Sequence, residues 1–238
     1  MLTIQFHGHS CIQLTDGEHS LIIDPFLSQN PLAVTKPEDI RVQHVLLTHA
    51  HGDHILDAAQ IARSNDATIV AIPELASYMS WQGAKTNDMN IGGRISIGYA
   101  EVQMVQAFHS SGIIDHKKQQ IIYAGMPAGF VIRWNGYTIY HAGDTNLFLD
   151  MKLIGERNQI DVAFLPIGDH YTMGPEDAAL AAEWLQAKLV VPLHYDTFEV
   201  IRQDEEAYVE LLKSRKIKGK VLKPGDRFEL QRKDDCSH

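Results

Sequence analysis

The stretch that most constrains this chain is Thr48–His54, in which three histidines and one aspartate fall within six residues. The apolar run Val42–Leu47 precedes it and is typical of a buried strand. Apolar residues at the spacing of one helix face follow it over 55–63. We therefore expect the stretch to form the turn from the end of a strand into a helix, where open α/β sheets place their functional sites.

The residue types in this turn indicate metal binding. His49 and His51 are two residues apart, so in extended backbone their side chains leave the chain on the same side. Asp53 and His54 lie where the chain enters the helix, and we expect them to point toward a second position. Imidazole and carboxylate ligands together suit zinc, manganese or iron.

The motif His49-x-His51-x-Asp53-His54 resembles the signature of the metallo-β-lactamase superfamily. Later segments that contain His109, Asp144 and His194 match further ligand positions of that family in the same order. Periodicity alone predicts only a mixed α/β chain. The resemblance implies a single domain with the four-layer αββα sandwich, spanning 1–232, and 233–238 is expected to be a flexible tail.

The resemblance also implies a site for two divalent cations, with zinc first and manganese or iron as alternatives. The implied ligands are His49, His51 and His109 for one cation, Asp53, His54 and His194 for the other, and Asp144 as the bridge between them. A two-metal site of this kind activates water for attack on an ester, lactone or phosphodiester bond. In this family Asp53 would also act as a catalytic residue that accepts the proton of the water.

Four shorter segments resemble a small bacterial and archaeal group of metal-dependent hydrolases related to sugar-phosphate lactonases. They are Gly8–Ser10, Phe108–Gly112, Tyr171–Pro175 and His194–Phe198. His170, Tyr171 and Met173 are candidates to line the substrate pocket, with a structural role as the alternative. His9 and Asp24 are candidates to support the ligands from behind, and for His9 a purely structural role is the alternative.

Two other functions are compatible with the same motif. One is an iron-dependent oxidoreductase of this fold. Its diiron members carry Glu at the position of His51, which counts against the diiron type, but His51 does not exclude the monoiron type. The other is a metal-binding module, a protein that binds metal but catalyses no reaction. The presence of all seven ligand residues counts against this alternative. A metal-dependent hydrolase is therefore the predicted function.

Composition limits the partners and the compartment. The formal net charge of −9 argues against nucleic acid, because phosphate binding needs clustered Lys and Arg. We expect a small-molecule substrate, and an anionic one held by metal ions is compatible with this charge. No apolar run reaches the roughly 18 residues of a membrane span, and no leader is evident at Met1–His7. Cys11 and Cys236 are the two cysteines, and a structural disulfide is not expected. These features predict a cytoplasmic enzyme, and a homo-oligomer is compatible with them.

Local patterns predict the elements around the motif. Asn135-Gly136 predicts a tight hairpin between strands at 128–134 and 138–141. Helices are expected over 55–63, 73–81, 175–185 and 204–214, and a closing strand over 221–230. We expect loops at 27–40, which either overhangs the site or is a plain connection, and at 110–120 on its rim.

Overall fold

The computed structural model describes residues 1–230, and within them the strands form a sheet of seven, a sheet of six and a separate pair. The first sheet has the spatial order β15 (Arg227–Leu230), β1 (Leu2–Gly8), β2 (Cys11–Thr15), β3 (Ser20–Ile23), β4 (His44–Leu46), β5 (Thr68–Ala71) and β6 (Lys85–Asp88). The second has the order β14 (Leu189–Leu193), β13 (Val162–Pro166), β12 (Tyr137–His141), β11 (Ala128–Trp134), β8 (Glu101–Gln106) and β7 (Arg94–Ser96).

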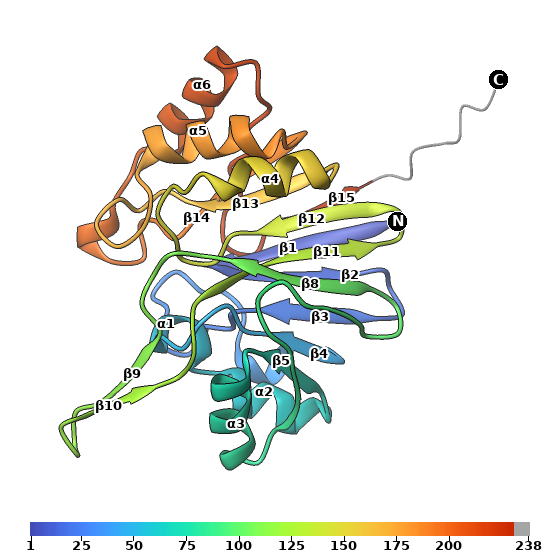
Figure 1. Ribbon diagram of the computed structural model, residues 1–238, viewed down its shortest axis with the longest axis vertical. Coiled ribbons are helices and arrows are strands. Elements are labelled where there is room, and N and C mark those ends of the chain that lie inside the picture. The colour runs from blue at the N-terminus through green and yellow to red at the C-terminus, as the bar shows by residue number, and fades with distance from the viewer. Residues whose placement is uncertain (231–238) are drawn as a thin grey trace.

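The helices cover the outer faces of the two sheets (Figure 1). Beside the first sheet lie α1 (Gly52–Ile55), α2 (Ala58–Asn65) and α3 (Pro73–Trp81). Beside the second lie α4 (Asp150–Arg157), α5 (Pro175–Leu185) and α6 (Glu205–Ser214). Two short 3-10 helices, η1 (Pro37–Asp39) and η2 (Glu199–Ile201), occur in connections. The predicted αββα sandwich is confirmed. Within 1–230 no helix has the length and hydropathy needed to cross a bilayer.

Alternating side chains explain how the second sheet is buried on both faces. Phe130 and Ile132 of β11 pack into the core between the sheets, whereas Val131 packs into the core beneath α4–α6. In β13, Phe164 likewise packs into the core between the sheets, and Ala163 packs into the core beneath α4–α6. Because successive residues of a strand point to opposite faces, apolar residues in sequence fill two cores at once.

The hairpin between β11 and β12 forms as predicted. Asn135 and Gly136 both have positive φ, 51° and 81°, which is the backbone that a type I′ turn requires. The helices predicted at 73–81, 175–185 and 204–214 correspond to α3, α5 and α6.

Other elements differ from the prediction. The helix expected over 55–63 is divided into α1 and α2, because the backbone N–H of Asp57 donates to Pro25 O at 3.2 Å instead of to a carbonyl of the preceding helical turn. The buried side chain of Asp57 holds the same connection by accepting from the backbone N–H groups of Leu27 and Ser28. The segment expected as a rim loop over 110–120 instead contributes to the hairpin of β9 (Gly112–Asp115) and β10 (Gln120–Tyr123), which extends away from the body (Figure 1). The closing strand is shorter than expected, β6 and α4 were not predicted, and the expected tail over 233–238 lies outside the described residues.

Candidate metal centre

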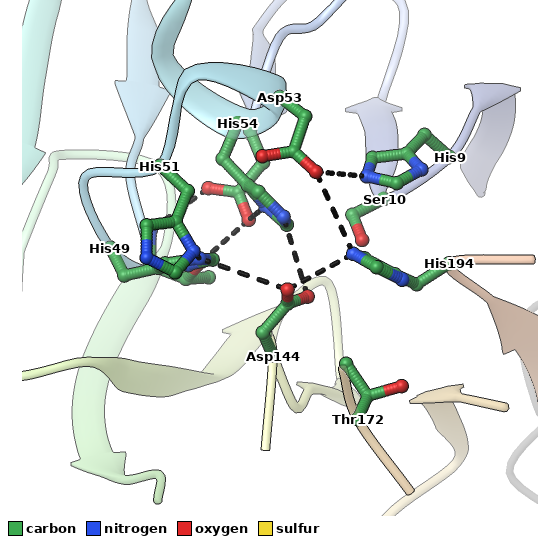
Figure 2. A network of polar contacts seen from close by, with 12 residues as sticks. His9, Ser10, His49, His51, Asp53, His54, Asp144, Thr172 and His194 are labelled. Atoms are coloured by element: carbon green, nitrogen blue, oxygen red, sulfur yellow. Dashed lines mark hydrogen bonds and ion pairs between the residues drawn. The ribbon is translucent and has the colours of Figure 1, made fainter. Parts of the chain in front are cut away.

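The His-rich turn joins β4 to α1, as predicted from the sequence. His51 lies just before α1 in extended backbone, and Asp53 and His54 occupy the first turn of that helix. Nε2 of His49 lies 3.0 Å from Nδ1 of His51, so the two imidazoles face each other. Asp53 and His54 point from the helix toward a neighbouring position, as expected for a second pair (Figure 2).

Asp24, at the end of β3, supports this turn from behind. Its Oδ1 accepts the backbone N–H of Thr48 at 2.8 Å, and its Oδ2 accepts the Thr48 hydroxyl at 2.6 Å. Oδ2 also lies 2.8 Å from Nδ1 of His54, which must carry the proton because a carboxylate only accepts. The Thr48 oxygen in turn lies 3.0 Å from Nδ1 of His49. This network fixes a proton on Nδ1 of each ring and directs Nε2 of both histidines into the site, where that nitrogen is free of a proton when the ring is neutral.

Three segments of the second sheet complete the cluster at the ends of β8, β12 and β14. The backbone turns sharply at Gly143, where φ is +62° and a Cβ would come within 2.8 Å of Ala128 O and Thr48 Cβ. This close approach places Asp144 against the histidine turn of the first sheet. The side chains that both sheets contribute surround its carboxylate (Figure 2).

Asp144 lies at the centre of the cluster. Its Oδ2 is 3.0 Å from Nε2 of His194, 3.5 Å from Nε2 of His109 and 3.8 Å from Nε2 of His49. Its Oδ1 is 3.3 Å from Nε2 of His54. One carboxylate thus contacts residues from both of the expected ligand sets.

The potential ligand atoms form three groups, in each of which the atoms lie within 4.8 Å of one another; Asp24, His49 and His54 make up one of them, and the other two correspond to the expected ligand sets. These two are His49, His51, His109 and Asp144, and His9, Asp53, His54 and His194. Among the described residues, Oδ1 of Asp144, Nε2 of His54 and both ring nitrogens of His194 are buried without a hydrogen-bond partner. Buried polar atoms are rarely left in this state, so the residues fit bound cations well. The structure brings together all seven predicted ligands; their binding of metal stays a prediction.

His9 connects Asp53 to the second sheet. Its Nε2 lies 3.0 Å from Oδ2 of Asp53 and its Nδ1 lies 2.9 Å from the hydroxyl of Thr197. Because the carboxylate only accepts, Nε2 donates and Nδ1 accepts from Thr197. The ring also lies 4.1 Å, centroid to centroid, from that of His194. This arrangement agrees with the expected supporting role, and His9 also belongs to the ligand-atom group of Asp53, His54 and His194.

The electrostatics keep the carboxylates charged and most of the imidazoles neutral. Burial lowers the pKa of His49, His51 and His109, which favours the neutral form that binds metals. Burial opposes the charged form of Asp144, but His194 and His54 outweigh it and hold the pKa of Asp144 well below its usual range. For His54, burial is likewise outweighed by Asp144 and Asp24, and its pKa is raised. Cation binding at this position must therefore displace a proton from His54.

A cavity of about 450 Å³ opens onto the cluster. Besides Asp144, it is lined by His51, Asp53, His109, Ser110, Tyr171, His194, Phe198 and Val200. Of the residues expected to line the pocket, Tyr171 is on its wall. His170 is exposed beside the Tyr171 ring, and Met173 is buried in the core beneath α4–α6.

Several residues at the site were not predicted from the sequence. Thr48 and Thr197 fix the orientation of histidines, and the hydroxyl of Ser110 lies 3.1 Å from Nε2 of His51. Phe198 and Val200 form part of the cavity wall. Four of them lie in segments that the sequence motifs already single out and could have been considered: Thr48, Ser110, Thr197 and Phe198. Val200 lies outside these segments, and no local pattern indicates that it lines the cavity.

Comparison with known proteins agrees with this geometry. The model of the family described as "Beta-lactamase superfamily domain" matches residues 19–195. A protein of Geobacillus sp. named "UPF0173 metal-dependent hydrolase" is 53% identical over 96% of this chain and 100% of its own length. A relative of the same name from Bacillus velezensis is 52% identical with the same coverage. The solved structure of Igni18, described as a novel metallo hydrolase from Ignicoccus hospitalis, has a TM-score of 0.86 and 35% identity, covering 97% of this chain and 99% of that chain.

The chain therefore belongs to the β-lactamase superfamily and, within it, to the family named UPF0173 metal-dependent hydrolase. The predicted family, fold class and enzyme class are confirmed by these findings. They favour a hydrolase over the iron-dependent oxidoreductase and over a module without turnover.

Proposed function

We propose that this enzyme holds two divalent cations, zinc by preference, and hydrolyses an ester, lactone or phosphodiester bond of a small molecule. The observation that carries the proposal is the position of Asp144, whose two oxygens contact histidines of two adjacent ligand groups. One group offers His49, His51 and His109, and the other offers Asp53, His54 and His194, with His9 behind Asp53.

Cations bound in such sites lower the pKa of water toward about 7 and stabilise negative charge that develops on a substrate oxygen. The chain's own residues supply orientation and proton transfer. Asp53 lines the cavity, and its Oδ2 is held by His9 at 3.0 Å. Burial opposes its charge, but the hydrogen bond from His9 holds the pKa of Asp53 below its usual range, so the carboxylate is ionised. Because this ionised carboxylate faces the cavity, we assign Asp53 as the group that accepts a proton from water there.

The proposal is tested by metal analysis and reconstitution. Protein stripped with a chelator should bind two zinc or manganese ions per chain and regain hydrolysis of p-nitrophenyl esters, a lactone or a phosphodiester. The variant His109→Ala should bind one ion fewer, and Asp53→Asn should lower kcat by about 100-fold or more. His116→Ala, an exposed change on the β9–β10 hairpin, is the matched control and should retain both properties.

Two results would contradict the proposal. Wild-type protein that takes up no transition metal would remove its basis. Protein that retains iron and consumes oxygen, but hydrolyses no substrate when loaded with zinc or manganese, would support the oxidoreductase instead. The cytoplasmic location and a homo-oligomeric state stay predictions.

A further inference from the structure

We infer that the substrate presents an uncharged, apolar acyl or aryl group to the outer part of the cavity. This inference rests on the proposed function and narrows it, because it disfavours substrates that carry a charge away from the bond that is cleaved, a class that the sequence left open. It follows from the unequal chemistry of the cavity wall. The polar residues gather at the ligand cluster, whereas Tyr171, Phe198 and Val200 form the rest.

The wall offers nothing to hold a negative charge beyond the cluster. None of the described residues that line the cavity is Lys or Arg. The Ser110 hydroxyl is directed at Nε2 of His51, 3.1 Å away. An anionic group on the far part of a substrate would therefore lose water without gaining a cationic partner, which is unfavourable.

Basic residues do line another cavity of this protein, so their absence from the lining of the cavity at the ligand cluster is specific to that cavity. Arg41 and Arg227 border a polar cavity of about 310 Å³ over β1 and β2, together with His7 and threonine and glutamine side chains. That cavity shares no residue with the one at the metal cluster. The chain therefore has cationic groups beside a cavity, but not beside the cavity where hydrolysis is proposed.

The apolar wall is exposed in the absence of substrate. Tyr171 and Val200 are each 55% exposed and Phe198 is 37% exposed. The segment of Phe198 and Val200 is fixed by backbone hydrogen bonds from Asp196 to Ile201 and from Ile201 to Phe198, at 3.0 and 3.1 Å. The Phe198 ring also contacts His9, with centroids 5.6 Å apart. Contact with an apolar substrate would remove this preformed surface from water, which favours binding.

The test compares substrates that share a leaving group. p-Nitrophenyl esters of acetate, butanoate and pentanoate should show kcat/KM rising by roughly 4-fold for each methylene that enters the cavity. The p-nitrophenyl monoester of glutarate has the same number of acyl carbons as the pentanoate but ends in a carboxylate. It should be at least about tenfold poorer than the pentanoate.

A charged variant of the wall should reverse this preference. Val200→Lys is an exposed change that the fold should tolerate, and it should move the ratio of pentanoate to glutarate kcat/KM by about 10-fold or more toward glutarate. Leu153→Lys, at a residue of α4 that is 54% exposed and does not line this cavity, is the matched control and should leave the ratio unchanged. Equal use of both esters by wild type, or an unchanged ratio in Val200→Lys, would overturn the inference.

Binding to metal-free protein separates this inference from the proposed function. Saturation-transfer NMR should detect pentananilide, a neutral anilide, and not phenyl phosphate, and the pentananilide signal should weaken in Val200→Lys. If no substrate is hydrolysed but pentananilide binds in this way, the proposed function is wrong and the inference that the wall binds an apolar group is supported. If esters are hydrolysed but pentananilide does not bind, or phenyl phosphate binds as well, the inference fails alone.

Discussion

Replacing Asp24 with Asn should weaken metal binding without any change in a ligand residue. The carboxylate of Asp24 is fully buried and accepts three hydrogen bonds, two from Thr48 and one from His54. The amide oxygen of Asn can still accept the Thr48 backbone N–H. Its NH2 group, however, would face the Thr48 hydroxyl and Nδ1 of His54, and it donates where the carboxylate accepted.

This single change should alter two ligands. When NH2 donates to Nδ1 of His54, the proton of that imidazole moves to Nε2. When it donates to the Thr48 oxygen, the hydroxyl turns to donate to Nδ1 of His49, 3.0 Å away, with the same result. In His49 the nitrogen that faces Asp144 would then carry a proton, and in His54 the one proton that remains in the neutral ring would lie on that nitrogen. Neither nitrogen could bind a cation without losing its proton.

The expected loss of metal affinity can be estimated from similar changes in other metal sites. Removing a group that orients a metal-binding histidine lowers affinity by about 10- to 100-fold, or about 1.4–2.7 kcal/mol. The metal-free protein loses the charge interaction between Asp24 and His54, for which about 1–3 kcal/mol of unfolding free energy is expected. The variant should therefore fold and bind zinc more weakly.

Competition with a chromophoric chelator measures the zinc affinity, and urea denaturation of metal-free protein measures stability. Asp88→Asn, at an exposed position of β6, is the matched control and should match wild type in both. Asp24→Asn protein with zinc affinity within about twofold of wild type, a difference of about 0.4 kcal/mol, would refute the reasoning about proton positions.

Two further predictions concern stability. In urea denaturation, Gly143→Ala should lower the unfolding free energy by about 1–3 kcal/mol more than Gly136→Ala does. Both glycines have positive φ, but of the two only Gly143 has other atoms within 4 Å of the added Cβ. Equal losses of unfolding free energy in the two variants would contradict the steric argument. Asp57→Ala should cost about 2–4 kcal/mol by the same measurement, since it leaves the buried N–H of Leu27 and that of Ser28 without their acceptor; a loss no larger than that of Asp88→Ala would contradict it.

The sequence was most informative where a local pattern determines the outcome. Asn135-Gly136 specifies its turn by backbone conformation alone, and the prediction there was correct. The apolar strands that end at the motif segments predicted where His109, Asp144 and His194 would lie, because the ends of neighbouring strands meet at one edge. The structure brings these side chains together as the spacing and the resemblance implied.

The sequence was less informative where a contact between distant segments decides the structure. Asp57 lies within a helical pattern, yet its backbone N–H bonds to Pro25 O and its side chain bonds to residues 27 and 28, and the helix is divided there. The strands β9 and β10 pair with each other away from both sheets, and their polar, glycine-containing surroundings resemble a loop. Phe198 and Val200 reach the cavity only because the chain after β14 folds back over His9, and this is not visible in the order of residues.

The ligand cluster draws on both sheets, and this origin has a consequence for the lifetime of the protein. A cation held between the histidines of the β4–α1 turn and Asp144 would act as a cross-link between the two halves of the sandwich. At a free metal concentration 1,000 times the dissociation constant, it would add about 4.1 kcal/mol to the free energy of unfolding. Protein without the ion would then lose activity and also unfold more often, which exposes it to proteolysis. The supply of metal would therefore affect the amount of enzyme as well as its activity.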